Sequence, residues 1–129
     1  MAASADQIRA TIDAYMAAFS DGSKQGYLDC FAPDATVEDP VGSEVHRGQA
    51  QIAAFWDSVR ALSPSIVLRP VGTARVAAGE GAFAMQAVAD VGGTALVVDI
   101  IDVMSFDDDG HITAMRAFWD PSEMRPADG

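Results

Sequence analysis

Residues 94–106 read TALVVDIIDVMSF, a run rich in β-branched side chains that neither glycine nor proline interrupts. Such a run predicts a β-strand, in which successive side chains point to opposite faces. One face of this strand carries Asp102 as its only ionisable group. Its neighbours on that face are Leu96, Val98, Ile100, Met104 and Phe106, while the opposite face carries Val97, Asp99, Ile101, Val103 and Ser105.

Asp102 is the first candidate functional residue. A carboxyl group on an apolar face is desolvated, which disfavours its charged form and raises its pKa. A carboxylic acid that stays protonated at neutral pH can donate a hydrogen bond, which suits stabilising negative charge on a substrate oxygen. The strand alone leaves another interpretation open, in which Asp102 accepts a hydrogen bond from a backbone amide or forms an ion pair with an arginine.

The first half of the chain has helical patterning. Ser4 and Gln7 have the spacing of a capping box, and the residues after them repeat an apolar stripe at helical intervals. We expect three helices. The first begins after Ser4 and ends at Asp21-Gly22, the second covers Lys24 to Phe31, and the third runs from Gly48 to Leu62. The apolar stripes are Ile8, Ile12, Tyr15, Met16 and Phe19 in the first helix, and Ile52, Phe55, Trp56, Val59 and Leu62 in the third.

The second half has strand patterning, with turn signals at Gly92-Gly93 and at 107–110. We expect strands over 35–38, 65–69, 73–77, 82–91, 94–106 and 111–119, and a loose tail over 121–129. Helices followed by hairpin-linked strands predict one α+β domain over residues 1–129. A curved, mainly antiparallel sheet with three helices from the N-terminal half would enclose an apolar pocket in a conical fold.

Composition excludes several classes of function. The net charge of −11 argues against nucleic acid and anionic membrane surfaces as partners. No apolar stretch approaches the ~20 residues of a membrane span, and the N-terminus does not resemble a signal peptide. Cys30 is the single cysteine, so a reducing cytoplasm is the expected location, and Cys30 is expected in the core rather than as a nucleophile. His46 and His111 are expected at the surface.

Two further residues are candidates for chemistry. Tyr15 lies on the buried stripe of the first helix, so its hydroxyl needs a partner inside the protein, although it could be a core tyrosine only. Asp39 ends a short strand before Pro40, where an aspartate could simply form a turn.

Taken together, the segments around these residues resemble the bacterial Δ5-3-ketosteroid isomerases. The resemblance is carried by IDAY at 12–15, DATVEDPVGSE at 34–44, GQAQIAAFW at 48–56, DIIDVM at 99–104 and MRAFW at 115–119. It extends from about residue 6 to residue 120. The long segment at 34–44 is the most specific of these motifs.

The resemblance implies an activity and roles for residues. A β,γ-unsaturated 3-ketosteroid would be isomerised through a dienolate, with Asp39 as the ionised base and with Tyr15 and protonated Asp102 donating to the oxygen. These are the roles already described for ketosteroid isomerases, which need no metal or other cofactor. Accordingly, the sequence has no metal-ligand cluster or phosphate-binding loop. Trp119 would hold Asp39 through its indole N–H, and the expected substrate-binding residues are Phe55, Trp56, Phe83, Met85, Met115 and Trp119, which could equally be core residues.

One pair of positions departs from the family pattern. Members place a tyrosine where this chain has Trp56, and some place another where it has Phe31. Neither residue carries a hydroxyl, so we expect the hydrogen-bond network behind Tyr15 to be weakened.

Alternatives remain open because one fold hosts many functions. The chain could be a related isomerase or cyclase that acts on a non-steroid ketone through an enolate, or a non-catalytic ligand-binding or dimerisation domain. The apolar residues on the second face of strand 94–106 predict a homodimer formed through the sheet, as the resemblance also implies.

Overall fold

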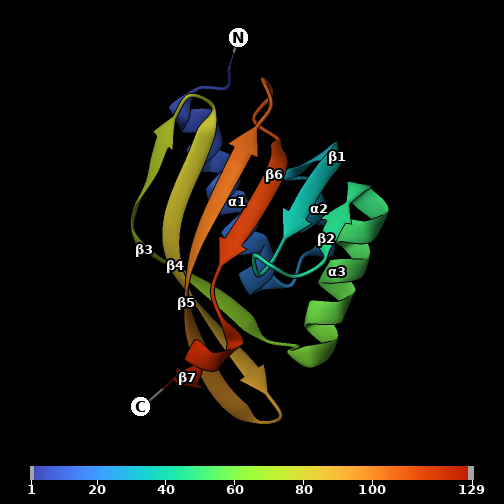
Figure 1. Ribbon diagram of the computed structural model, residues 1–129, viewed down its shortest axis with the longest axis vertical. Coiled ribbons are helices and arrows are strands. Elements are labelled where there is room, and N and C mark those ends of the chain that lie inside the picture. Colours follow the sequence, from blue (N-terminus) through green and yellow to red (C-terminus); the bar gives the residue numbers. More distant parts are fainter. Residues whose placement is uncertain (1, 128–129) are drawn as a thin grey trace.

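The computed structural model describes residues 2–127 and shows three α-helices packed against one open, curved sheet (Figure 1). The helices are α1 (Ala5–Asp21), α2 (Lys24–Leu28) and α3 (Gly48–Leu62). The strands are β1 (Phe31–Glu38), β2 (Val45–Arg47), β3 (Ile66–Ala77), β4 (Glu80–Val91), β5 (Thr94–Phe106), β6 (Ile112–Phe118) and β7 (Arg125–Pro126). The α+β prediction is confirmed.

The sheet order brings distant parts of the sequence together. The strands follow one another as β2-β1-β6-β5-β4-β3, with β7 paired to β5. All pairings are antiparallel except that of β1 with β6, which is parallel. The end of β1 therefore lies beside the end of β6, with Val37 opposite Met115, although 78 positions of sequence separate the two strand ends at Glu38 and Arg116.

Helix α1 begins and ends at the residues that the sequence predicts. The Ser4 side chain accepts from the Gln7 N–H and the Gln7 side chain accepts from the Ser4 N–H, so the predicted capping box is present. Gly22 ends the helix in the left-handed conformation with φ of 73°, which glycine adopts without a steric penalty. The apolar stripe of α1 faces β3 and β4, while α3 covers β1 and β2 (Figure 1).

Several predicted boundaries were wrong. The helix expected over 24–31 ends at Leu28, because Phe31 pairs with Ile112 and starts β1. The two strands expected over 65–69 and 73–77 are one strand, β3, with a register shift between Val71 and Arg75. Strand β2 was not predicted from the sequence.

The tail is ordered through Pro126. Residues 121–123 form a 3₁₀ turn, and β7 pairs with Leu96 and Val97 near the start of β5 (Figure 1). Arg125 also forms an ion pair with Asp99 at 3.1 Å. The expected loose tail is therefore corrected over 121–126, and its last two residues, 128–129, lie outside the described residues.

Two smaller points bear on function. Cys30 is buried, and burial raises the pKa of its thiol to about 11, which makes it a poor nucleophile at neutral pH. No helix within residues 2–127 is long and apolar enough to cross a membrane.

Candidate active site

Asp102 lies in the middle of β5, with Phe83 of β4 on one side and Ala117 of β6 on the other. The alternation predicted for this strand is confirmed, since Val98, Ile100 and Met104 are buried on the same face. The Asp102 side chain is fully buried, and neither carboxyl oxygen has a hydrogen-bond partner among residues 2–127. Burial, and secondly the charge of Asp39, raise the pKa of Asp102 well above its usual value. The charged form of Asp102 is therefore disfavoured relative to that of an exposed aspartate.

Asp39 directly follows β1 and is held by Trp119, the residue that directly follows β6. The Trp119 indole nitrogen donates to Oδ1 of Asp39 at 2.6 Å, which leaves the second carboxyl oxygen for another partner. The loop after Asp39 is fixed by the Val41 N–H, which donates to the Ala117 carbonyl at 2.8 Å. Because Ala117 is also the cross-strand neighbour of Asp102, the loop after Asp39 and the backbone of Asp102 both lie beside one residue of β6.

The two carboxyl groups have different surroundings. Burial raises the pKa of Asp39, while the Trp119 hydrogen bond and the nearby His46 lower it. Asp102 has no such compensation, and the charge of Asp39 raises its pKa further. When one of the pair ionises, the charge is therefore favoured on Asp39 and the proton on Asp102.

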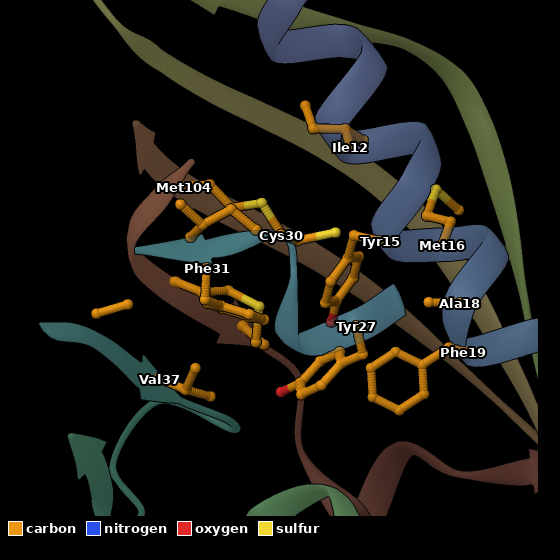
Figure 2. Packing of buried hydrophobic residues seen from close by; sticks show 14 of the residues in the cluster. Ile12, Tyr15, Met16, Ala18, Phe19, Tyr27, Cys30, Phe31, Val37 and Met104 are labelled. Atoms are coloured by element: carbon orange, nitrogen blue, oxygen red, sulfur yellow. The ribbon is translucent and has the colours of Figure 1, made fainter. Parts of the chain in front are cut away.

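Tyr15 faces the same region from α1. Its side chain is 2 % exposed and packs in a cluster of aromatic rings with Phe19, Tyr27 and Phe31 (Figure 2). Burial, then Asp102, then Asp39 raise the pKa of the Tyr15 phenol well above 10.0. Its hydroxyl therefore keeps its proton at neutral pH and can donate a hydrogen bond. Since the charges of Asp102 and Asp39 both act on the pKa of Tyr15, the three side chains lie in one region of the structure.

The residues predicted to line the substrate site divide into two groups. Phe83, Met85, Met115 and Trp56 are buried within the core. Phe55 and Trp119 are partly exposed. A cavity of about 300 Å³ lies between α1 and strands β3 and β4. Phe83 borders it, but Tyr15, Asp39 and Asp102 do not.

Sequence reasoning missed two residues of this region. His46, which was expected at the surface, is partly exposed. It pairs with Val37 in the β1–β2 ladder, its ring centroid lies 4.8 Å from that of Phe55, and its charge lowers the pKa of Asp39. Tyr27 of α2 is fully buried against Tyr15 and was not singled out at all. The five residues of α2 carry too short a pattern to have predicted its burial.

One group of side chains has the composition of a metal site. Ligand atoms of Asp107, Asp109 and His111 lie within 4.8 Å of one another. Asp107 already accepts from the N–H groups of Asp109 at 3.0 Å and His111 at 2.9 Å. These bonds form the turn between β5 and β6 and account for the clustering without an ion.

Comparison with known proteins places the chain in a family. The SnoaL-like domain family matches residues 12–115. The steroid Delta-isomerase of Nocardioides simplex is 42% identical over 118 residues, which cover 92% of this chain and 94% of the relative. The epoxide hydrolase/cyclase-like enzyme SalBIII, described in pyran ring formation in the polyether salinomycin, has a similar structure. Its TM-score is 0.85 at 22% identity, over 94% of this chain and 96% of that chain, which shows a shared fold. The resemblance to bacterial ketosteroid isomerases is thus confirmed by the similarity to a steroid Delta-isomerase, and the chain belongs to the SnoaL-like domain family.

Proposed function

We propose that this protein isomerises Δ5-3-ketosteroids to their conjugated Δ4 isomers by intramolecular proton transfer. The observation that carries the proposal is Asp102, a fully buried carboxyl group with no hydrogen-bond partner among the described residues. A buried polar group without a partner is costly, and a ligand oxygen would supply the missing acceptor. The 42% identity to a steroid Delta-isomerase supports the substrate class.

The proton moves through Asp39. Trp119 holds Oδ1 of Asp39, so Oδ2 is the atom that takes the proton from the carbon between the ketone and the double bond. The electrons of the broken C–H bond pass into a dienolate, whose oxygen accepts hydrogen bonds from Tyr15 and Asp102. Asp39 then returns the same proton two carbons further along, so the reaction needs no cofactor and consumes none. Each well-placed donor contributes ~10²–10³ in rate.

The remaining roles follow from position. We assign Phe55, Trp56, Phe83, Met85 and Met115 to the walls against which an apolar steroid packs, and Trp119 to orienting Asp39. We also propose that two copies associate through the outer face of the sheet. Ile101 and Phe118, which pair across β5 and β6, are 52% and 42% exposed there and support this arrangement.

The test is the appearance of conjugated-enone absorbance when the protein is added to 5-androstene-3,17-dione. Asp39→Asn keeps the shape of the side chain but removes the base, and we expect a loss larger than the ~10²–10⁴ typical of general acid–base groups, because this base acts in both steps. Near-normal turnover by Asp39→Asn would remove Asp39 from the mechanism.

Binding separates the remaining alternatives. Equilenin, a phenolic steroid that mimics the dienolate, should bind tightly and compete with the substrate. Equilenin binding without isomerisation would favour a ligand-binding domain. Failure of both assays, with turnover of a non-steroid β,γ-unsaturated ketone, would favour a related isomerase or cyclase.

A further inference from the structure

His46 brings an ionisable ring to the helix-covered face of the sheet, beside the proposed base. It lies in β2, where it pairs with Val37 of the neighbouring strand β1. Residues that pair directly across two strands point to the same face, and Val37 is fully buried. The His46 ring also packs on Phe55, with a centroid distance of 4.8 Å, and Phe55 belongs to α3, which lies against β1 and β2 (Figure 1). Both contacts direct the imidazole toward the face that the helices cover.

Asp39 points to the same face. It lies two residues after Val37, and alternate residues along a strand share a face. Its partner Trp119 lies two residues after the buried Ala117 of β6 and donates to Oδ1 of Asp39 at 2.6 Å, which fixes the carboxyl group on this side. His46 is therefore the diagonal neighbour of Asp39 across β1 and β2, a relation that separates two residues by about 7–8 Å.

The imidazole has no other buried charge beside it. The remaining charged side chains nearby on these strands are Glu38, Glu44, Arg47 and Arg116. Alternation turns Glu38 to the opposite face, where it accepts from Arg116 at 3.3 Å, and turns Arg47 to that face as well. Glu44 is exposed. The charged residues of α3, Asp57 and Arg60, contact Lys24 and the end of α1 instead.

The electrostatics of Asp39 agree with this placement. Burial raises the pKa of Asp39, while the Trp119 hydrogen bond and the charge of His46 lower it. Only one of the two favourable contributions changes with pH. An indole N–H does not titrate, whereas an imidazole ordinarily gains its proton as the pH falls from about 8 to 5. The carboxylate thus has a constant partner in Trp119 and a pH-dependent neighbour in His46.

We propose that His46 is a positioning residue for the proposed base: its protonated ring holds Asp39 in the ionised form below neutral pH and extends catalysis to lower pH. The inference rests on the proposed isomerase function. A protonated carboxyl group cannot take a proton from the substrate, so activity falls as Asp39 gains its proton. A neighbouring imidazolium opposes that protonation. Two unit charges at this separation shift a titration midpoint by about 0.5–1.5 pH units.

The first test needs no steroid. His46 and His111 are the only histidines of the 129-residue chain, so the Cε1 proton signals in NMR report on two sites. His111 lies after the β5–β6 turn, 3.8 Å from Asp107, and is the internal control. Because the coupling of two titrating groups is reciprocal, Asp39→Asn should lower the midpoint of the His46 titration by about 0.5–1.5 pH units and leave that of His111 in place. An unchanged or raised His46 midpoint, or an equal shift of both histidines, would overturn the proposal.

The second test is kinetic and separates charge from packing. His46→Phe keeps a ring against Phe55 but cannot be charged, whereas His46→Gln keeps a polar side chain but removes the ring. With 5-androstene-3,17-dione as substrate, both variants should move the acid limb of kcat/KM to higher pH by about 0.5–1.5 units. Above about pH 8 both should match the wild type, since the imidazole is then neutral. His111→Gln is the matched control and should leave the profile unchanged.

The other kinetic outcomes count against the proposal. A shift in His46→Gln alone would assign the effect to packing on Phe55, and a uniform loss at every pH without a shift would assign it to the fold. Coincident profiles of the wild type and both variants would show that the charge does not act on the base. If the wild type has no isomerase activity, the proposed function fails, whereas the NMR titration still decides whether His46 and Asp39 are coupled.

Discussion

Asp102 and Asp99 show how one strand gives the same side chain two different chemistries. Their odd separation puts them on opposite faces of β5. Asp99 faces solvent, accepts from Gln86 at 3.0 Å and Arg125 at 3.1 Å, and these partners lower its pKa. Asp102 faces the core without partners, and burial raises its pKa. The alternation of the strand therefore places a surface ion pair on one face and a candidate hydrogen-bond donor of the active site on the other.

Asp102 variants test whether this residue acts as a donor. We expect Asp102→Leu to lower kcat by ~10²–10³, because the dienolate oxygen loses one donor. Asp102→Asn should be milder, since an amide still donates. The comparison of the two kcat values with 5-androstene-3,17-dione checks this. An Asn variant no better than the Leu variant would show that hydrogen bonding by Asp102 does not matter.

The raised pKa of Asp102 also predicts a pH dependence of stability. A carboxyl group whose pKa is higher in the folded than in the unfolded state contributes stability below its unfolded pKa of about 3.9. That contribution is lost as pH rises toward the folded pKa, with a slope of up to ~1.4 kcal/mol per pH unit. Between about pH 5 and pH 7, the free energy of unfolding should therefore fall less steeply for Asp102→Asn than for the wild type.

Urea unfolding at several pH values measures this difference. Asp39 contributes with the same sign in both proteins, because burial raises its pKa as well. Subtracting the two curves isolates Asp102. Parallel curves would mean that Asp102 ionises in the folded protein as easily as in the unfolded chain.

At the scale of elements, the close approach of α1 to β4 depends on a glycine. A Cβ atom built on Gly81 would lie 3.1 Å from Cδ1 of Ile12 and 3.3 Å from Cγ2 of Ile8. Gly81 also pairs with Met104, two residues after Asp102 on the buried face of β5. The missing side chain thus lets the helix that carries Tyr15 pack closely on the sheet that carries Asp102.

Gly81→Ala should destabilise the fold by roughly 1–3 kcal/mol, the usual cost of overpacking a core. Ile12→Val removes the Cδ1 atom that the new methyl group would meet. The double variant should therefore be more stable than the sum of the two single changes predicts, as measured by urea unfolding. Simple additivity would locate the effect of Gly81→Ala elsewhere.

The elements were predictable where one face is buried over a long stretch. The burial of Val98, Ile100 and Met104 follows from period-2 alternation alone. Predictions were wrong where tertiary pairing overrides local preference. Phe31 lies in a strand and not in the expected helix, because it pairs with Ile112. Strand β3 continues through Gly72, whose φ of 74° is also typical of a turn.

For the whole molecule, the assembly of the site was beyond what local pattern could predict. Periodicity identified Asp102 and Tyr15 separately, but their proximity to Asp39 depends on the parallel pairing of β1 with β6. Only the family resemblance anticipated that grouping. Tyr27 was missed because a five-residue helix carries too short a pattern to show which face is buried.

The outer face of the sheet carries the last prediction. Ile101 and Phe118 form a directly paired apolar contact on this face, and both are substantially exposed. Covering it with a second copy removes this apolar surface from water, but each copy carries a net charge of −11. Association should therefore strengthen as salt screens the repulsion between the copies.

We expect a dimer by sedimentation velocity at micromolar concentration, and a shift toward monomer in Ile101→Lys, which buries a charge at the contact. Ala54→Lys, on the exposed side of α3, adds the same charge away from the sheet and is the matched control. Because Lys lowers the net negative charge equally in both variants, a difference between them isolates the contact from overall repulsion. A monomeric wild type, or equal dissociation of both variants, would show that the outer face of the sheet is not the interface.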